Sequence, residues 1–383
     1  MSRLRTLFFF CVMTAGLVAA FVGGYVVRAR QTVPSAPFSL LNEAYQNLRT
    51  YGLYDLPEGK TLAYGAIRGM VQAYADPYTV FVEPPQSELQ NDALSGQFGG
   101  IGVTLEQTLD GQVILHPLPD SPALEAGIRD GDILQQVDAL KVTPAVSLDQ
   151  IQAALRGPTT QAVQMQVARP PAWEQFSFTV RRAWFEIPSV TWYVDADEAR
   201  LGIVAVNRMA ATTADEIRQA VEALSVQGAT RFVLDLRDNG GGLLDAGVQS
   251  ARLFLSSGVI LQQQYRGKPV ESVAVEAPGP LVSLPLVVLV NHGTASAAEL
   301  LAGALQAQGR APLIGEPTYG KDTLQLLLTL SDGSSMHVTA ARWWVPGLPK
   351  PIGEGGLQPD FPVDATLPKA FLHAAGRYFF GQP

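Results

Sequence analysis

Residues that build the commonest metal and redox sites are scarce in this chain. Cys11 is the only cysteine among 383 residues, so no disulfide can form within the chain and no cysteine-based zinc site exists. The histidines are too scattered for their spacing to indicate a metal site: His116, His292, His337 and His373. We therefore expect neither a metal ion nor another cofactor.

Positive charge is also scarce, because the formal net charge is -8 and the lysines and arginines form no cluster. A protein that binds nucleic acid concentrates these residues on one face, so we expect no nucleic-acid partner. Apolar residues are abundant instead, at 47% of the chain against 16% charged residues. This composition is typical of a globular protein, and the length is sufficient for two or three domains.

One long apolar stretch, Thr6–Val27, is about the length needed to cross a bilayer as a helix. Two arginines stand on each side of it, which leaves its orientation undecided by charge: Arg3, Arg5, Arg28 and Arg30. A cleaved signal peptide is the alternative, since Val18 and Ala20 fit a small-residue cleavage site. The apolar run continues past that site, which favours an uncleaved membrane anchor within residues 1–30.

The rest of the chain divides into four parts, at residues 31–92, 93–182, 183–368 and 369–383. The first is a linker and a helical segment from Leu40 to Tyr78, which Pro77 interrupts. The second alternates as strands and turns, with short helices at "SPALEAG" and "SLDQIQAAL", and is predicted to be a β-rich module. The third repeats strand, glycine-rich turn and helix, which predicts an α/β domain with a buried sheet. The fourth is a C-terminal tail.

Ser296 stands among small residues in "NHGTASAAE", just after the apolar run 284–291. One interpretation is structural, because Ser296 and Glu299 have the spacing of a capping box at the start of a helix. The other is catalytic, because small neighbours leave room for a substrate to reach the hydroxyl. One serine can serve both purposes, and this segment alone does not decide between them.

A serine hydroxyl is a poor nucleophile unless a base takes its proton. His292 lies close to Ser296 in the sequence, but nothing in the spacing aims its ring at the serine, which disfavours a histidine-based triad. A lysine becomes a base when burial lowers its pKa, and Lys321 precedes the leucine-rich stretch 324–328, which predicts a buried strand. For an arbitrary lysine the commoner case is a strand-end side chain that reaches solvent.

Six blocks of sequence resemble, in order, the carboxyl-terminal processing proteases, or tail-specific proteases, which are serine peptidases with an embedded PDZ domain. The blocks are "YGAIRGMVQAYADPYTVFVEP", "GQFGGIGV" with "SPALEAGIRDGDILQQVD", "LDLRDNGGG", "NHGTASAAE", "GEPTYGKDTLQ" and "GGLQPDFPV". The resemblance implies an α/β peptidase core of crotonase-like strand-turn-helix units with an inserted β-rich PDZ domain. An N-terminal helical segment and a membrane-anchor helix would precede them.

The resemblance also implies roles for individual residues. Ser296 would be the nucleophile, Lys321 the general base, and Gln325 the residue that orients the lysine. Positions four apart in a regular strand are separated by roughly 13 Å, so Lys321 and Gln325 can meet only through long side chains or a local bend. The backbone N–H groups of Ala297 and of Gly241 or Gly242 would stabilise the oxyanion, although the glycines alone also fit an ordinary tight turn.

A PDZ domain binds an extended peptide at a sheet edge and captures its terminal carboxylate with backbone N–H groups of a glycine-rich loop. The matching loop here is "FGGIG": Phe98, Gly99, Gly100, Ile101 and Gly102. The implied partners are therefore protein or peptide substrates with free C-termini. Arg169, which closes the last strand of this module, is a candidate for coupling peptide binding to the active site.

The resulting prediction is a membrane-associated serine endopeptidase with one N-terminal span and an extracytoplasmic catalytic domain, or a secreted enzyme if the N-terminal segment is cleaved. A non-catalytic PDZ scaffold or chaperone at the membrane is the alternative, although it predicts a broken serine/lysine pair. A PDZ protease with a trypsin-like domain is disfavoured, because the sequence lacks the serine motif of such a domain. A crotonase-like enzyme acting on acyl thioesters is disfavoured by the PDZ block. Relatives often dimerise through terminal segments, which leaves a homodimer open.

Overall fold

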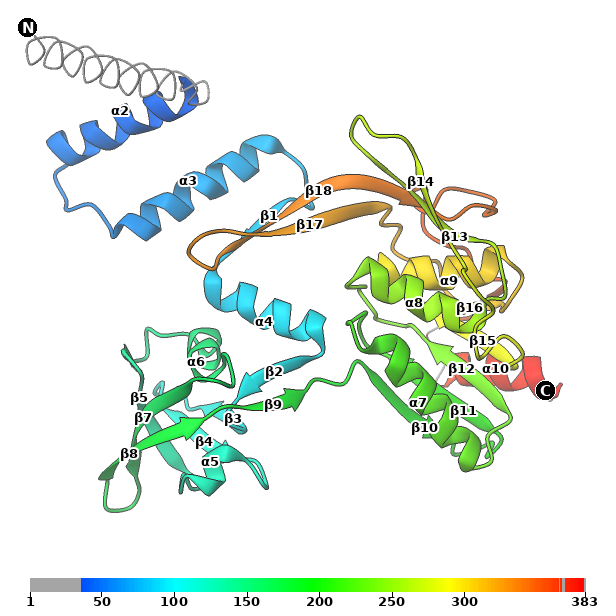
Figure 1. Cartoon of the computed structure of the whole chain (residues 1–383), viewed down its shortest axis with the longest axis horizontal. Coiled ribbons are helices and arrows are strands. Elements are labelled where there is room, and N and C mark those ends of the chain that lie inside the picture. Colours follow the sequence, from blue (N-terminus) through cyan, green and yellow to red (C-terminus); the bar gives the residue numbers. More distant parts are fainter. Residues whose placement is uncertain (1–35, 365, 367–368, 382–383) are drawn as a thin grey trace, which may run out of the picture. The chain divides into compact units, whose positions relative to one another are not determined.

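The computed structural model describes residues 36–364, 366 and 369–381, and the chain divides into two compact units at Gly69 and Met70 (Figure 1). The predicted membrane segment, Thr6–Val27, lies outside the described residues. Within the described part, every helix is too short or too polar to cross a bilayer.

The N-terminal unit contains α2 (Ala36–Tyr51) and the first part of α3 (Gly59–Tyr74). The helical pattern predicted from Leu40 to Tyr78 is therefore two helices. Gly52 and Pro57 lie between them, and both residue types disfavour a continuous helix. The predicted stop before Pro77 is confirmed.

The β-rich module has the following elements: β2 (Gln97–Gly100), β3 (Val103–Gln107), β4 (Val113–Pro117), α5 (Pro122–Glu125), β5 (Asp132–Val137), β6 (Leu140–Lys141), α6 (Leu148–Leu155), β7 (Ala162–Arg169), β8 (Glu174–Arg181) and β9 (Ala183–Glu186). Its main sheet is antiparallel with the order β3-β4-β5-β7-β8, and β6 pairs with β5. Both predicted helices form. Val163, Met165 and Val167 alternate with exposed glutamines along β7 and are buried in the module's core.

The chain enters and leaves this module on neighbouring strands, because β2 and β9 form an antiparallel pair in which Gly99 lies opposite Trp184. The rings of Phe98 and Phe185 stack on this pair with their centroids 5.4 Å apart. Adjacent entry and exit points are typical of a module inserted into a host domain.

The central α/β part contains β10 (Val190–Val194), β11 (Leu201–Val206), α7 (Thr213–Val226), β12 (Arg231–Asp235), α8 (Leu244–Phe254), β15 (Leu286–Val290), α9 (Ala297–Ala307), β16 (Leu313–Gly315), β19 (Phe361–Pro362) and α10 (Ala370–Phe380). Its sheet has the order β10-β11-β12-β15-β16-β19, and all neighbours except β10 and β11 are parallel. The predicted alternation of strands and helices is confirmed.

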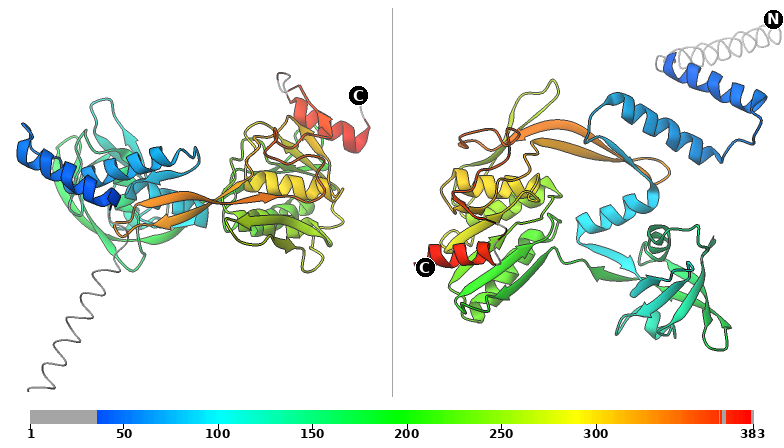
Figure 2. Two further views of the ribbon diagram at one scale, coloured as in Figure 1. Left: turned by 90° about the horizontal axis from the view of Figure 1, so that it is seen from above. Right: turned by 180° about the vertical axis from the view of Figure 1, so that it is seen from behind.

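Alternate residues of the central strands face two separate cores. Val204, Leu234 and Val288 pack with α7, α8 and α9, whereas Val233 and Val287 pack with Phe371 and Ala375 of α10. Helix α10 lies over the sheet in the view from behind (Figure 2). Because the parallel strands are buried on both faces, the turns at their carboxyl ends are the exposed places where a site can form.

A further sheet contains β1 (Val80–Val82), β13 (Val259–Tyr265), β14 (Glu271–Ala274), β17 (Thr323–Thr329) and β18 (Ser335–Trp344), while α4 (Pro84–Ser95) links β1 to the module. Val80 lies opposite His337, so β1 brings the segment after α3 alongside β18. The predicted strand at 324–328 forms, but Leu326, Leu327 and Leu328 are 40%, 41% and 48% exposed. The prediction of burial was therefore wrong for these residues, because β17 is an edge strand in the described structure.

Candidate active site

Ser296 occupies a strained turn between β15 and α9. Its backbone dihedrals are φ 56° and ψ −121°, in a region that residues with a Cβ rarely adopt. Hydrogen bonds fix the turn, since Thr294 Oγ1 donates to the Leu236 carbonyl at 2.8 Å and Ala295 N–H donates to the Asn239 carbonyl at 2.9 Å. A serine on a sharp strand-to-helix turn is the arrangement that presents a nucleophile at the end of a sheet.

The glycine turn after β12 packs directly against Ser296. A Cβ on Gly241 would lie 2.9 Å from Ser296 Cβ and 3.1 Å from Ala297 N, and the φ of Gly241 is +97°. Gly241 N–H donates to Asn239 Oδ1 at 2.9 Å. The structure thus brings Gly241 close to Ser296 and Ala297, whereas Gly242 packs against Met209, and the N–H of Gly241 is engaged within the turn.

Glu299 links the Ser296 turn to the segment that carries the predicted base, Lys321. Its carboxylate accepts hydrogen bonds from Ser296 N–H at 2.8 Å and from Lys321 N–H at 2.9 Å, both through Oε2. Oε1 accepts from Gly320 N–H at 2.7 Å and from the Thr318 hydroxyl. The glutamate half of the predicted capping box therefore forms, but the same buried carboxylate also positions the lysine loop.

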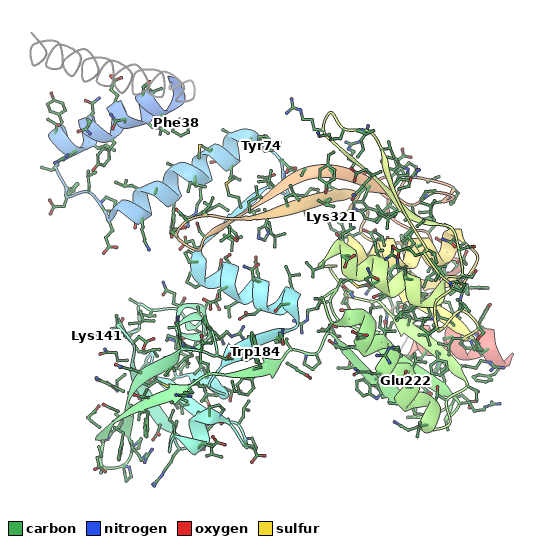
Figure 3. All side chains as sticks on the ribbon, viewed as in Figure 1. Phe38, Tyr74, Lys141, Trp184, Glu222 and Lys321 are labelled. Carbon is green, nitrogen blue, oxygen red and sulfur yellow. The ribbon has the colours of Figure 1, made fainter. Side chains whose placement is uncertain are left out.

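Lys321 lies just before β17 and is half-buried (Figure 3). Burial lowers the pKa of Lys321 below its ordinary value, while the charges of Glu299 and Asp76 oppose that shift. Its Nζ lies 5.0 Å from the centre of the Tyr78 ring. Among the hydrogen bonds of the described residues, none joins Lys321 Nζ to Ser296 Oγ. The environment thus favours a neutral amine more than water does, as a general base requires.

Gln325 lies beyond a local irregularity of β17, where the pairing with β18 shifts register between Leu324 and Gln325. In this structure the Gln325 amide contacts two threonines, at 3.3 Å from Thr323 Oγ1 and 3.4 Å from Thr339 Oγ1. Its role in orienting Lys321 stays a prediction.

The segment from Asp76 to Thr79 belongs to the same site, and the sequence indicated only that a helix ends there. Although burial opposes it, hydrogen bonds from Thr339 and Thr79 lower the pKa of Asp76. Thr339 N–H also donates to Thr79 Oγ1 at 3.2 Å, across 260 positions of the chain. No local pattern reveals such a distant pairing, which is why this part of the site was missed.

His337 is the histidine that the structure brings near the site. It lies on β18, and burial and then the positive charge of Lys321 lower its pKa. No hydrogen bond links a histidine to Ser296 among the described residues, and these residues include no group of three or more His, Cys, Asp or Glu side chains arranged to hold a metal. The geometry thus directs attention to lysine as the base.

A groove of about 360 Å³ lies in the β-rich module between edge strand β3 and helix α6. Its lining includes four residues of the predicted carboxylate-binding loop: Phe98, Gly100, Ile101 and Gly102. The fifth, Gly99, supports the loop, because its carbonyl accepts a hydrogen bond from Gly157 N–H at 3.0 Å just beyond α6. The loop and the groove therefore coincide.

Among the described residues that line the groove, Arg156 is the one with a charged side chain, and the sequence did not reveal it. Its guanidinium lies 4.0 Å from the centre of the Phe98 ring, and Nη1 lies 2.9 Å from Asp92 Oδ2 on α4. Arg169, in contrast, binds buried Asp132 through two hydrogen bonds of 2.7 and 2.8 Å within the module. These contacts give Arg169 a role in holding β7 to β5, and the structure offers no support for the predicted coupling.

A model of peptidase family S41 matches residues 200–363 of this chain. The carboxy-terminal processing protease CtpA of Bacillus subtilis is 32% identical over 351 residues, which cover 90% of this chain and 74% of the relative. A carboxyl-terminal-processing protease of Picosynechococcus sp. is 37% identical over 301 residues, or 78% of this chain and 72% of the relative. Among solved structures, the photosystem II D1 C-terminal processing protease is 32% identical, covers 86% of this chain and 89% of its own, and has a TM-score of 0.47.

Two neighbouring glycines provide a matched test of the Ser296 turn. We expect Gly241→Ala to reduce peptidase activity roughly 100-fold, because the new Cβ would displace Ser296 and strain a positive φ. Gly240→Ala is the control, since nothing lies within 4 Å of its added Cβ. Initial rates on an unfolded protein substrate measure both, and equal rates for the two variants would contradict this placement of Gly241.

A second test concerns Glu299. Glu299→Gln places an amide where four donors converge, so we expect activity to fall roughly 100-fold and the free energy of unfolding to fall by about 1–3 kcal/mol. Exposed Glu354→Gln serves as the control for loss of a carboxylate. Rates and urea denaturation measure the two effects, and wild-type values for Glu299→Gln would show that the carboxylate does not position the site.

Proposed function

This chain belongs to peptidase family S41 and is a serine-type carboxyl-terminal processing protease, and from this we propose that Ser296 and Lys321 form its catalytic dyad. We further propose that it is membrane-associated and recognises the C-termini of its substrates through a PDZ domain. One observation supports the dyad above all others. Through one oxygen atom, Oε2, the carboxylate of Glu299 accepts hydrogen bonds from two backbone N–H groups. One belongs to Ser296, whose backbone is strained, and the other to half-buried Lys321.

The proposed reaction follows from this arrangement. The neutral amine of Lys321 takes the proton from Ser296 Oγ, which attacks the scissile carbonyl and forms a tetrahedral intermediate. The N–H groups of Gly242 and Ala297 stabilise its oxyanion, each by a few kcal/mol. The resulting lysine ammonium gives its proton to the leaving amine. Water then releases the acyl group by the same steps, with Lys321 acting again as base and Gln325 as the proposed orienting residue.

Substrate recognition is proposed for the groove of the β-rich module. Strand β3 is an edge strand, so an extended peptide can pair with it, and α6 closes the other side. The side chains of Ile101, Leu118 and Leu155 make the lining apolar, which favours an apolar C-terminal residue. Arg156 adds a positive charge for the terminal carboxylate beside the backbone N–H groups of the Phe98–Gly102 loop.

Membrane association is proposed from the apolar stretch Thr6–Val27 alone, which is long enough to serve as a single span. The catalytic part would then lie on the extracytoplasmic side. Comparing the full chain in membrane and soluble fractions, before and after an alkaline wash, tests this proposal. Release of the protein by the wash would contradict an anchor.

The dyad is tested with the full chain and an unfolded protein that ends in an apolar residue. We expect Ser296→Ala and Lys321→Ala each to abolish cleavage, because one variant removes the nucleophile and the other the base. Lys350→Ala is the matched control, since the side chain of Lys350 is exposed. The measurement is the rate of product formation by gel and mass spectrometry.

The outcomes separate the competing functions. Cleavage by the Ser296→Ala variant would show that another nucleophile is responsible and that the proposed dyad is wrong. Binding of the C-terminal tail without cleavage by any form would favour the non-catalytic scaffold. Cleavage by the wild type and by Lys350→Ala, but not by Ser296→Ala or Lys321→Ala, supports the peptidase.

Recognition of the C-terminus has its own test. We expect Arg156→Gln to weaken binding of a peptide with a free C-terminal carboxylate roughly 10- to 100-fold, because a charged hydrogen bond is lost. Exposed Arg129→Gln is the control. Titration calorimetry with free and amidated peptides measures the effect. Equal affinity of the wild type for both peptides would contradict capture of the carboxylate.

A further inference from the structure

We propose that Tyr78 is a positioning residue for Lys321, whose ring binds the lysine in its ammonium form and thereby determines how readily the neutral base becomes available. This inference rests on the proposed Ser296–Lys321 dyad. It adds to that site a residue from the segment that precedes the β-rich module, outside the region matched by the family model.

The geometry of the contact carries the inference. Lys321 Nζ lies 5.0 Å from the centre of the Tyr78 ring, within the distance at which an ammonium is attracted to the face of an aromatic ring. Both side chains are half-buried. Because water screens such a pair less than it would at the surface, the ring has a measurable effect on the charge of the amine.

Two parts of the chain lie beside Tyr78. The nearby Tyr319 side chain, followed by burial, raises the pKa of Tyr78. Tyr319 precedes Gly320 and Lys321, so Tyr78 lies beside the lysine loop itself. On the other side, β1 begins at Val80 and pairs with β18 at His337. This pairing keeps the backbone of Tyr78 near the lysine.

Other charged groups face the amine, but their polar atoms are occupied. Glu299 accepts four hydrogen bonds from the Ser296 turn and the lysine loop, and Asp76 is bound by two threonines. His337 and the lysine disfavour each other's positive charge. Asp322 and Tyr319 act on Tyr78. The contact that the structure shows for Lys321 Nζ is the one with the face of the Tyr78 ring.

The consequence is a shift in pH dependence with a definite sign. Removing the ring destabilises the ammonium, so the pKa of Lys321 falls and the neutral base appears at lower pH. The acid limb of kcat/KM therefore moves to lower pH in Tyr78→Leu, by about half a unit to one unit. Tyr78→Phe keeps the ring face and leaves the limb within a few tenths of a unit of its wild-type position.

The experiment measures Lys321 directly as well as through catalysis. The full chain is treated with acetic anhydride at a series of pH values, and mass spectrometry gives the labelling rate of each lysine and hence its pKa. The variants are Tyr78→Leu, Tyr78→Met and Tyr78→Phe, with exposed Tyr74→Leu as the control. The methionine variant replaces the leucine variant if thermal melting shows that the latter does not fold.

We expect the labelling pKa of Lys321 to fall in Tyr78→Leu or Tyr78→Met and to keep its wild-type value in Tyr78→Phe and Tyr74→Leu. An unchanged pKa in the leucine and methionine variants overturns the inference, and so does an equal fall in Tyr78→Phe. A merely structural role would lower the melting temperature without moving the pKa. Failure of the dyad itself would appear separately, as cleavage that persists in Ser296→Ala.

Discussion

The active site depends on one buried carboxylate. Glu299 is fully buried and accepts hydrogen bonds from the backbones of Ser296, Gly320 and Lys321. Burial raises the pKa of Glu299, whereas the hydrogen bonds from its donors lower it. An unpartnered buried carboxylate would be costly, so this group is stable only when both loops are in place. The interaction therefore makes the positions of Ser296 and Lys321, the proposed nucleophile and base, mutually dependent.

The central sheet explains why the three functional turns meet. The parallel strands β12, β15 and β16 end side by side, so the turns after Asp235, Val290 and Gly315 emerge at the same edge of the sheet. Glycine is required where these turns touch. A Cβ on Gly241 would collide with Ser296, and one on Gly293 would lie 2.7 Å from Asp238 Cα. Burial of the strands thus supplies the rigidity, and the glycines allow the close approach.

Much of the fold could be predicted from the sequence, because its period-two and helical patterns are local. The strand–helix repeats, the helix at "SLDQIQAAL" and the close approach of the glycine turn to Ser296 are visible in such patterns or in the family resemblance. The parts that could not be predicted are non-local. The contact of Tyr78 with Lys321 depends on the pairing of β1 with β18, and that of Arg156 with Asp92 joins α4 to the end of α6. The exposure of β17 follows from its edge position, which composition does not reveal.

The proposed lysine base would depend on these non-local contacts. Histidine titrates near neutral pH without assistance, whereas lysine must lose its charge several pH units below its ordinary pKa to act there. Burial lowers the pKa of Lys321 in this direction, but complete burial would leave the ammonium formed during the reaction without a partner. The surrounding groups resolve this conflict, because Asp76 and Glu299 lie near enough to stabilise the ammonium while their own oxygens are occupied by hydrogen bonds. In the proposed mechanism, the segment that leads into β1 thus acts on Lys321 although it is distant in sequence from both members of the proposed dyad.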